Sequence, residues 1–418
     1  MKKILALLLV CIFTLSLVAC DNDVTNTATN SQTQPSTEPA PTMKVAVLMK
    51  GSEDDPTAIS HVKGIKDAAK ELNISTEEMS FEYLVETDDT CYDKIAELSE
   101  NEYEVIISTD YNHQSYMEQA AKEFPKTTFV AISGDTAKDV DRSNFFNAYT
   151  YIFESRYVAG VVAGMKIKEL DAEGLLSKDN YNNDGNVKIG YVGTSPSAAV
   201  KSSYTAFYLG VKSVFENVSM AVQYTNKSND AKKDEETAKY LISQGCVVIG
   251  QHSTTDGVAK AVDKALEGSK KCYCVGYLTD LTKVSAKGAL TSSTHVWSVY
   301  YKELLNAVFN DEKLQQDWAD GYVVGAVDIT KLSDCCAKGT KEEVKRVVDA
   351  IKAEKLHVFN TSTFTVEAEK INAAYAIDTD GDEIADEYGA IFDGYFHESY
   401  FRSAPYFALD IDGISVLN

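Results

Sequence analysis

The stretch IGYVGTSPSAAVKSSYTAFYLG, residues 189–210, predicts a buried strand, a tight turn and a helix in direct succession. Residues 189–192 form a short apolar run, which is typical of a strand covered on both faces. The glycine and proline of GTSP, residues 193–196, end that run, and a helical pattern follows. The same order occurs near the start of the chain, where the apolar residues 45–49 precede a glycine-containing loop and a helix. Two similar openings predict two separate α/β units.

Short apolar runs alternate with helical stretches along both units. The apolar residues that recur at helical spacing after the first strand are Ile59, Val62, Ile65, Ala69 and Leu72. Further strand-like runs lie at residues 81–85, 105–107, 128–132, 187–192, 220–224, 247–250 and 272–275. This alternation predicts parallel sheets flanked by helices, an α/β fold with two Rossmann-like lobes. In such sheets ligands bind beyond the carboxyl ends of the strands, so two facing lobes predict a cleft that closes by hinge motion.

The first residues have the layout of a secretory signal. A basic start is followed by an apolar run at 4–18, which is shorter than the about 20 residues that a membrane-spanning helix needs. The run ends in LVAC, residues 17–20, which matches the lipobox of bacterial lipoproteins. We therefore expect a signal peptide over 1–19 and a diacylglyceryl group on Cys20, which would anchor the protein to a membrane outside the cytoplasm. The alternative is an ordinary signal peptide that happens to contain a cysteine.

Residues 20–43 are rich in Asn, Thr, Ser, Gln and Pro, and they predict a disordered tether behind the anchor because they contain too little apolar surface to fold. The whole chain of 418 residues carries a formal net charge of −23, which argues against nucleic acid as a partner. It contains no phosphate-binding P-loop, no G-x-S-x-G and no cysteine-nucleophile or metalloprotease signature. These absences indicate a protein that is not an enzyme.

The cysteines give no zinc-finger spacing. After loss of Cys11 with the signal peptide and acylation of Cys20, the remaining ones are Cys91, Cys246, Cys272, Cys274, Cys335 and Cys336. Buried free thiols are expected, and one long-range disulfide is left open because the protein is predicted to lie outside the cytoplasm.

Four segments together resemble one known family. They are YTYIFESRYVAGVVAG at 149–164, the opening stretch at 189–210, VVIGQHSTTDG at 247–257 and VGYLTDLTKVSAKGALTSSTHVWSVYY at 275–301. The chain from about residue 44 to residue 329 is similar to the basic membrane protein family, the PnrA-like purine-nucleoside-binding lipoproteins of ABC transporters. The resemblance implies a periplasmic-binding-protein type I fold, capture of a purine nucleoside or related small molecule, ABC permease subunits as partners, and no required cofactor.

On this resemblance we expect lobe 1 to contain residues 44–148 and a return segment near 280–325. Lobe 2 would contain 149–278 together with about 326–418, which includes a C-terminal extension. The alternative function is that of a surface sensor, or of a glycan- or peptide-binding lipoprotein, without a role in transport.

The resemblance also implies positions that contact the ligand. They are Asp54, Tyr111, His252, Asp280 and Trp297. Thr57 and Ser228 stand where the family usually has aromatic rings that sandwich the purine. A less planar and more polar ligand is therefore an alternative to a purine nucleoside. Each predicted contact also has a structural alternative: the aspartates can cap helices or turns, and His252 and Trp297 can belong to the core.

One acidic segment near the C-terminus resembles short calcium loops. Its pattern D-x-D-G-D-x-I-x-D places alternate carboxylates where they can wrap a hard cation. The carboxylates are those of Asp378, Asp380, Asp382 and Asp386. An acidic turn without a metal is the alternative, because the glycine and the terminal glutamate of an EF-hand loop are out of register.

Overall fold

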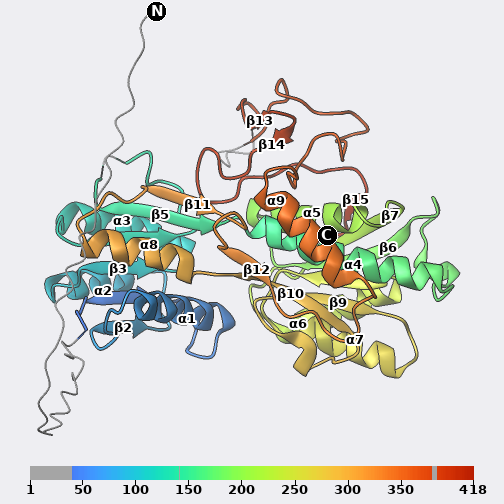
Figure 1. Cartoon of the computed structure of the whole chain (residues 1–418), viewed down its shortest axis with the longest axis horizontal. Coiled ribbons are helices and arrows are strands. Elements are labelled where there is room, and N and C mark those ends of the chain that lie inside the picture. The colour runs from blue at the N-terminus through green and yellow to red at the C-terminus, as the bar shows by residue number, and fades with distance from the viewer. Residues whose placement is uncertain (1–39, 141, 379–383) are drawn as a thin grey trace, which may run out of the picture. The chain divides into compact units, whose positions relative to one another are not determined.

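The computed structural model describes residues 40–140, 142–378 and 384–418 (Figure 1). The predicted signal peptide, Cys20 and nearly all of the predicted tether therefore lie outside the described residues, as do Asp380 and Asp382 of the acidic loop. Residues Ala40–Asn418 form one compact unit, which contains two large sheets. In the described part of the chain no helix is both long and apolar enough to cross a membrane.

Lobe 1 is built on a six-stranded parallel sheet in the order β11-β5-β4-β3-β1-β2. Its strands are β1 (Val45–Leu48), β2 (Met79–Glu82), β3 (Val105–Ser108), β4 (Thr128–Ile132), β5 (Phe145–Thr150) and β11 (Asp317–Asp320). Its helices are α1 (Pro56–Glu71), α2 (Asp89–Glu100), α3 (Gln114–Glu123) and α8 (Ser298–Phe309). Alternate residues of β1 enter different cores: Val45 and Val47 pack with α1 and α8, whereas Ala46 and Leu48 pack with α2 and α3. This double burial explains the continuous apolar runs of the sequence.

Lobe 2 contains a seven-stranded sheet in the order β12-β10-β9-β8-β6-β7-β15, parallel except for β12. Its strands are β6 (Val187–Gly193), β7 (Val218–Tyr224), β8 (Val248–Gln251), β9 (Tyr273–Tyr277), β10 (Ala289–His295), β12 (Val327–Ile329) and β15 (Ile414–Val416). Its helices are α4 (Ile152–Ala172), α5 (Ala198–Lys212), α6 (Ala231–Ser243), α7 (Gly257–Glu267) and α9 (Thr340–Lys352). The two-lobed α/β prediction is confirmed, with each sheet covered by helices (Figure 1).

Helices α4 and α5 touch backbone to backbone. A Cβ atom on Gly160 would lie 2.1 Å from the carbonyl oxygen of Phe207, and one on Gly210 would lie 2.0 Å from that of Tyr157. Larger residues at either position would force the helices apart. The two glycines therefore fix α5, whose N-terminus borders the cleft described below.

The chain passes between the two sheets after β5, after β10 and after β11. The sequence placed the return to lobe 1 near residue 280, and this start was too early. Strand β10 pairs with β9 in lobe 2, with Ser293 opposite Tyr277, so the return begins after His295. The sequence ALTSSTH of β10 is too polar for a search for apolar runs to identify it as a strand.

The C-terminal extension packs on lobe 2 with little regular structure. A short hairpin joins β13 (Ile391–Phe392) and β14 (Tyr395–Phe396), and β15 adds the last strand to the sheet beside β7. The aromatic side chains of the extension that enter the core of lobe 2 are Phe359, Phe364, Phe396, Tyr406 and Phe407. These rings make the extension a part of the lobe.

All six described cysteines are free thiols, and Cys91, Cys246, Cys272 and Cys274 are buried. Burial raises the pKa of the Cys91 and Cys246 thiols to about 12, which keeps both protonated and unreactive. The long-range disulfide that the sequence left open does not occur among these residues.

Candidate functional site

A cavity of about 560 Å³ opens between the lobes, at the carboxyl ends of strands from both sheets. Its size falls within the range of about 300–1,000 Å³ that is usual for small-molecule sites. The lining residues are Thr57, His61, Thr109, Tyr111, Ile132, Ser133, Asp135, Tyr149, Ser197, Ala198, Ala199, Tyr277, His295, Trp297, Arg402, Ala404 and Pro405. A second cavity of about 510 Å³ shares His295 and Trp297 but lies along the flank of α1 and β12, away from the strand ends of lobe 1.

The floor of the cleft cavity is a stack of three rings. Trp297 lies between His61, with ring centroids 4.5 Å apart, and His295, with ring centroids 4.9 Å apart. His61 Nδ1 shares a hydrogen bond of 2.6 Å with the hydroxyl of Tyr301, and His295 Nε2 shares one of 2.6 Å with that of Tyr277. Because both faces of the indole are covered, Trp297 is only 3% exposed and presents its edge to the cavity.

Burial keeps this floor neutral. It lowers the pKa of His61 to about 3 and that of His295 well below its usual range, because a buried imidazolium would lose its hydration. The stack therefore supplies a rigid, uncharged surface.

The wall from lobe 1 carries an aromatic ring and a carboxylate side by side. Tyr111 follows β3 and is 49% exposed, and its hydroxyl donates to Asp135 Oδ2 over 3.1 Å. Gln114 Nε2 donates to Asp135 Oδ1 over 2.8 Å, while Gln114 Oε1 accepts from the Asp135 backbone N–H over 2.6 Å. These contacts hold the carboxylate in one orientation at the edge of the cavity.

The wall from lobe 2 begins at the N-terminus of α5. The N-cap residue Ser197 makes no side-chain capping bond, and the backbone N–H groups of Ala198 and Ala199 have no acceptor among the described residues. Free N–H groups and the helix dipole together make this end of α5 electropositive.

Behind the same wall lies Arg156, which is 2% exposed. Its guanidinium carbon lies 4.0 Å from the ring centroid of Tyr277, and Nη1 donates to the carbonyl oxygen of Gln251 over 2.9 Å. Nε and Nη2 have no partner in the described structure. The position of Arg156 beneath a cavity-lining ring fits a supporting role.

The third wall comes from the C-terminal extension. Arg402, Ala404 and Pro405 line the cavity, although they lie far along the chain from its other residues. Neither Asp135 nor Arg402 was predicted from the sequence. The sequence does contain a signal for Asp135, because a carboxylate that follows a buried strand lies at the ligand-binding edge of a parallel sheet. It contains no such signal for Arg402, which lies in a segment without regular structure.

Of the five predicted contact residues, Tyr111 and Trp297 line the cavity, and Asp54, His252 and Asp280 do not. Asp54 is exposed on the loop before α1. His252 lies against Tyr277, with ring centroids 5.7 Å apart, and burial lowers its pKa to about 3. His252 thus lies behind a cavity-lining ring without itself forming the surface of the cavity.

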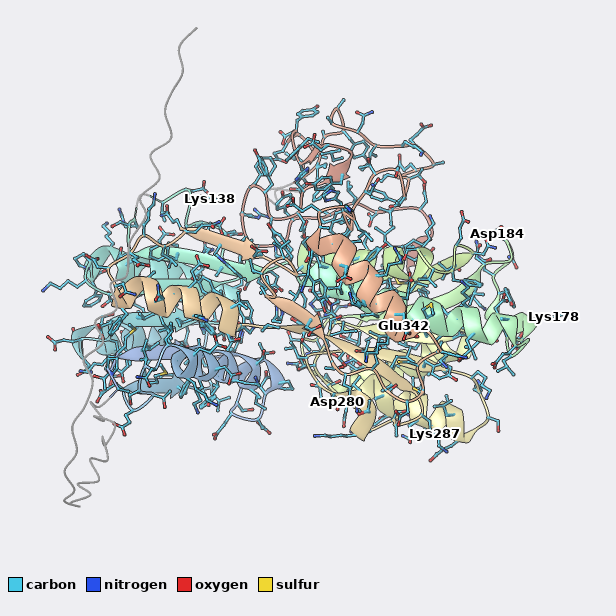
Figure 2. All side chains as sticks on the ribbon, viewed as in Figure 1. Lys138, Lys178, Asp184, Asp280, Lys287 and Glu342 are labelled. Carbon is cyan, nitrogen blue, oxygen red and sulfur yellow. The ribbon has the colours of Figure 1, made fainter. Side chains whose placement is uncertain are left out.

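Asp280 is exposed and caps a short 3₁₀ turn, Leu281–Lys283 (Figure 2). It accepts from the backbone N–H of Thr282 over 3.0 Å and from the hydroxyl of Thr282 over 2.6 Å, and the latter bond is the main cause of its lowered pKa. The structure thus gives Asp280 the capping role that the sequence left as the alternative.

The two described carboxylates of the acidic loop, Asp378 and Asp386, flank the isolated bridge between Ile377 and Glu387. Within the described ranges no group of three or more metal-ligating side chains occurs. The predicted calcium site depends on residues outside those ranges.

Two α/β lobes with a ligand-sized cavity between the carboxyl ends of their strands have the architecture of the periplasmic-binding-protein type I class. Residues 42–361 match the family model described as ABC transporter substrate-binding protein PnrA-like, and the chain belongs to this family. The family consists of solute-binding proteins rather than enzymes. The C-terminal extension from residue 362 onward, including Arg402, lies beyond the matched range.

Related proteins match parts of the chain. A purine-binding protein of Brucella abortus (strain 2308) is 27% identical over 249 residues, which are 60% of this chain and 62% of that protein. The ABC transporter nucleoside-binding protein BmpA of Lactococcus lactis is 25% identical over 179 residues, 42% of this chain and 45% of its own. The chain thus spans less than two thirds of the length of these relatives.

Solved structures share the fold. An ABC transporter solute-binding protein of Aeropyrum pernix K1 has a TM-score of 0.61 at 15% identity, over 76% of this chain and 93% of its own. A transcriptional activator of the comK gene from Bacillus halodurans has a TM-score of 0.58 at 17% identity, over 74% of this chain and 97% of its own. The fold alone therefore does not specify a function.

Proposed function

We propose that this protein is the substrate-binding subunit of an ABC importer and that its cleft captures a purine nucleoside or a closely related small molecule. The observation that carries the proposal is the pair formed by Tyr111 and Asp135 at the edge of the cavity. An exposed ring beside an oriented carboxylate suits a planar base attached to a sugar with hydroxyl groups. The names of the Brucella and Lactococcus relatives point to the same class of ligand.

Each wall has a distinct role in this proposal. Tyr111 offers the face of its ring for stacking, which contributes on the order of 1–3 kcal/mol per base. Asp135 keeps lone pairs for a ribose hydroxyl or a base N–H, because its two oxygens each accept only one protein hydrogen bond. The neutral stack of His61, Trp297 and His295 keeps water out of the floor of the cavity. The edge of Trp297 forms part of the surface that the ligand contacts.

The proposal also includes an extracytoplasmic location with a lipid anchor on Cys20 and ABC permease subunits as partners. The lipobox and the tether-like composition of residues 20–43 support it. The competing function is that of a sensor or a glycan- or peptide-binding lipoprotein. Adjacent genes for a permease and an ATPase would favour the importer, and their absence would favour the sensor.

A binding screen tests the ligand. Thermal shift followed by calorimetry with purine and pyrimidine nucleosides, nucleobases, sugars and amino acids should identify a purine nucleoside or a derivative of one. Asp135→Ala should weaken its binding by about ten- to a hundredfold, since a hydrogen bond to a charged group contributes about 1.5–3 kcal/mol. Asp280→Ala is the matched control, because it removes an exposed carboxylate outside the cavity, and it should bind as the wild type does. Equal losses in both variants, or a wild type that ignores every nucleoside and base, would refute the proposal.

A further inference from the structure

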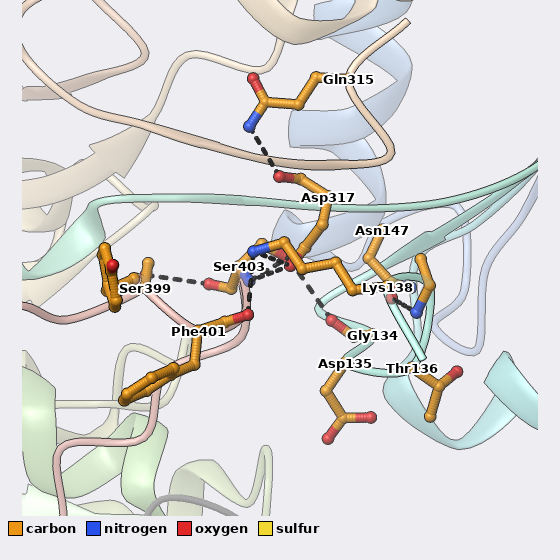
Figure 3. A network of polar contacts seen from close by, with 12 residues as sticks. Gly134, Asp135, Thr136, Lys138, Asn147, Gln315, Asp317, Ser399, Phe401 and Ser403 are labelled. Atoms are coloured by element: carbon orange, nitrogen blue, oxygen red, sulfur yellow. Dashed lines mark hydrogen bonds and ion pairs between the residues drawn. The ribbon is translucent and has the colours of Figure 1, made fainter. Parts of the chain in front are cut away.

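The C-terminal segment from Ser399 to Pro405 belongs to lobe 2 through β15 but is fastened to lobe 1. Figure 3 shows the contacts around Asp317, the first residue of β11. The backbone N–H of Ser403 donates to both carboxylate oxygens of Asp317, over 3.0 Å each. Lys138 Nζ lies 3.2 Å from the same carboxylate and donates to the carbonyl oxygen of Phe401 over 2.9 Å. We refer to Asp317, Lys138, Phe401 and Ser403 as the clasp.

The clasp fixes the backbone on both sides of Arg402. Phe401 is held through its carbonyl and Ser403 through its N–H, so the residue between them has little freedom to turn away. Ser399 reinforces this geometry by donating to the carbonyl oxygen of Ser403 over 3.1 Å. A side chain presented in this way is pre-organised for a ligand, which reduces the entropy cost of binding.

Arg402 lies over an aromatic ring of the extension, with its guanidinium carbon 5.8 Å from the ring centroid of Tyr406. The described structure gives its guanidinium neither a hydrogen bond nor an ion pair, and Nε is buried without an acceptor. The carboxylate that lines the cavity, that of Asp135, already accepts from Tyr111 and Gln114. Arg402 is half-buried, with Nε buried and without a hydrogen-bond partner, and an anionic oxygen group from a ligand would accept from this N–H.

A second electropositive feature lines the same cavity. The N-terminus of α5, a helix of 15 residues, presents the unpaired N–H groups of Ala198 and Ala199. The charge of Arg402 also reaches Tyr111, where it opposes the rise in the pKa of that hydroxyl. The guanidinium of Arg402 and the N-terminus of α5 are thus two electropositive groups in one cavity, which also contains the carboxylate of Asp135.

We propose that the cavity binds a nucleoside carrying an anionic oxygen group, a phosphate or a carboxylate, and that Arg402 binds this group opposite the N-terminus of α5. This inference rests on the proposed function and makes Arg402 a specificity-determining residue supplied by the extension. Arginine is suited to this role because its planar fork matches both anions in a bidentate manner.

Calorimetry with adenosine, guanosine and inosine, each compared with its 5′-monophosphate and its 5′-carboxylic acid, tests the proposal. At least one anionic derivative should bind about ten- to a hundredfold tighter than the parent nucleoside, the range that corresponds to a charge-assisted bond. The two derivatives distinguish phosphate from carboxylate. The preference should shrink from low to high salt, because ionic screening weakens charge pairs.

Arg402→Met should abolish the preference for the anionic derivative, and Arg402→Lys should keep part of it. Arg346→Met is the matched control: Arg346 is an exposed arginine on α9, paired with Glu343, and its loss should change nothing. A preference that survives in Arg402→Met, or a wild type that binds parent and derivatives equally at every salt concentration, would overturn the inference while leaving the proposed function intact. If no nucleoside or derivative binds the wild type, the proposed function fails and the inference fails with it.

Discussion

Replacement of Asp317 by alanine is expected to release the C-terminal extension from lobe 1. The carboxylate is almost completely buried, with 2% of its side chain exposed, and it accepts both hydrogen bonds from the N–H of Ser403. Ser403 is itself only 1% exposed, so Asp317→Ala leaves a buried N–H group without an acceptor. Loss of the charge-assisted bond costs about 1.5–3 kcal/mol. The ion pair with Lys138, whose side chain is 44% exposed, adds at most about 1 kcal/mol because solvent screens it.

The sum predicts a decrease of about 1.5–4 kcal/mol in the free energy of unfolding, which urea denaturation measures directly. Asp317→Asn should cost less, because the amide oxygen still accepts from Ser403. Lys138→Met should cost under about 1 kcal/mol, since it removes only the exposed half of the clasp. Limited proteolysis of Asp317→Ala should then cut the extension first. If Lys138→Met destabilises as much as Asp317→Ala, or if Asp317→Ala unfolds as the wild type does, the clasp does not hold the extension.

Three further outcomes are expected. Burial raises the pKa of Glu398 from 4.5 to about 8, so the folded protein binds a proton that the unfolded chain releases, and stability should fall as the pH rises from about 4.5 to 8. Glu398→Gln should flatten this slope in urea denaturation, and an unaltered slope would mean that Glu398 is already charged in the folded protein. Cys20→Ala should abolish labelling by an alkyne fatty acid, and label that persists on the variant would contradict the lipid anchor. Calcium should raise the melting temperature and a chelator should lower it if the acidic loop at 378–386 holds the ion, whereas an unchanged melt under both conditions indicates a simple acidic turn.

The fold was accessible from the sequence because its signals are local. Parallel strands buried on both faces must be apolar over four or five consecutive residues, and β1, β3 and β8 are entirely buried in this manner. The turn and helix that follow each strand are encoded within a few residues of it. Strand β10 was missed for the complementary reason: its Ser and Thr residues are buried by pairing with β9 and β12, and that pairing is a tertiary property.

The candidate site was accessible only in part. Tyr111 lines the cavity, as a residue in the loop directly after a strand is expected to do. Asp280 satisfies the same rule, yet its carboxylate turns to the backbone of its own loop and caps a 3₁₀ turn. For the Asp280 carboxylate, a local hydrogen bond to Thr282 competes with a contact to a ligand. The sequence is compatible with both arrangements and does not show which has the lower free energy.

The sequence by itself determined the class of fold, the alternation of strands and helices, and the family to which the chain belongs. Only the tertiary structure brought the extension back to the cleft, where Arg402 lines one cavity with residues that lie from 105 (Trp297) to 345 (Thr57) positions earlier in the chain. The physical reason is that this return depends on one buried carboxylate, Asp317, and on the N–H of Ser403. Neither group signals a long-range partner, because a carboxylate finds donors and a backbone N–H finds acceptors almost anywhere in a folded chain.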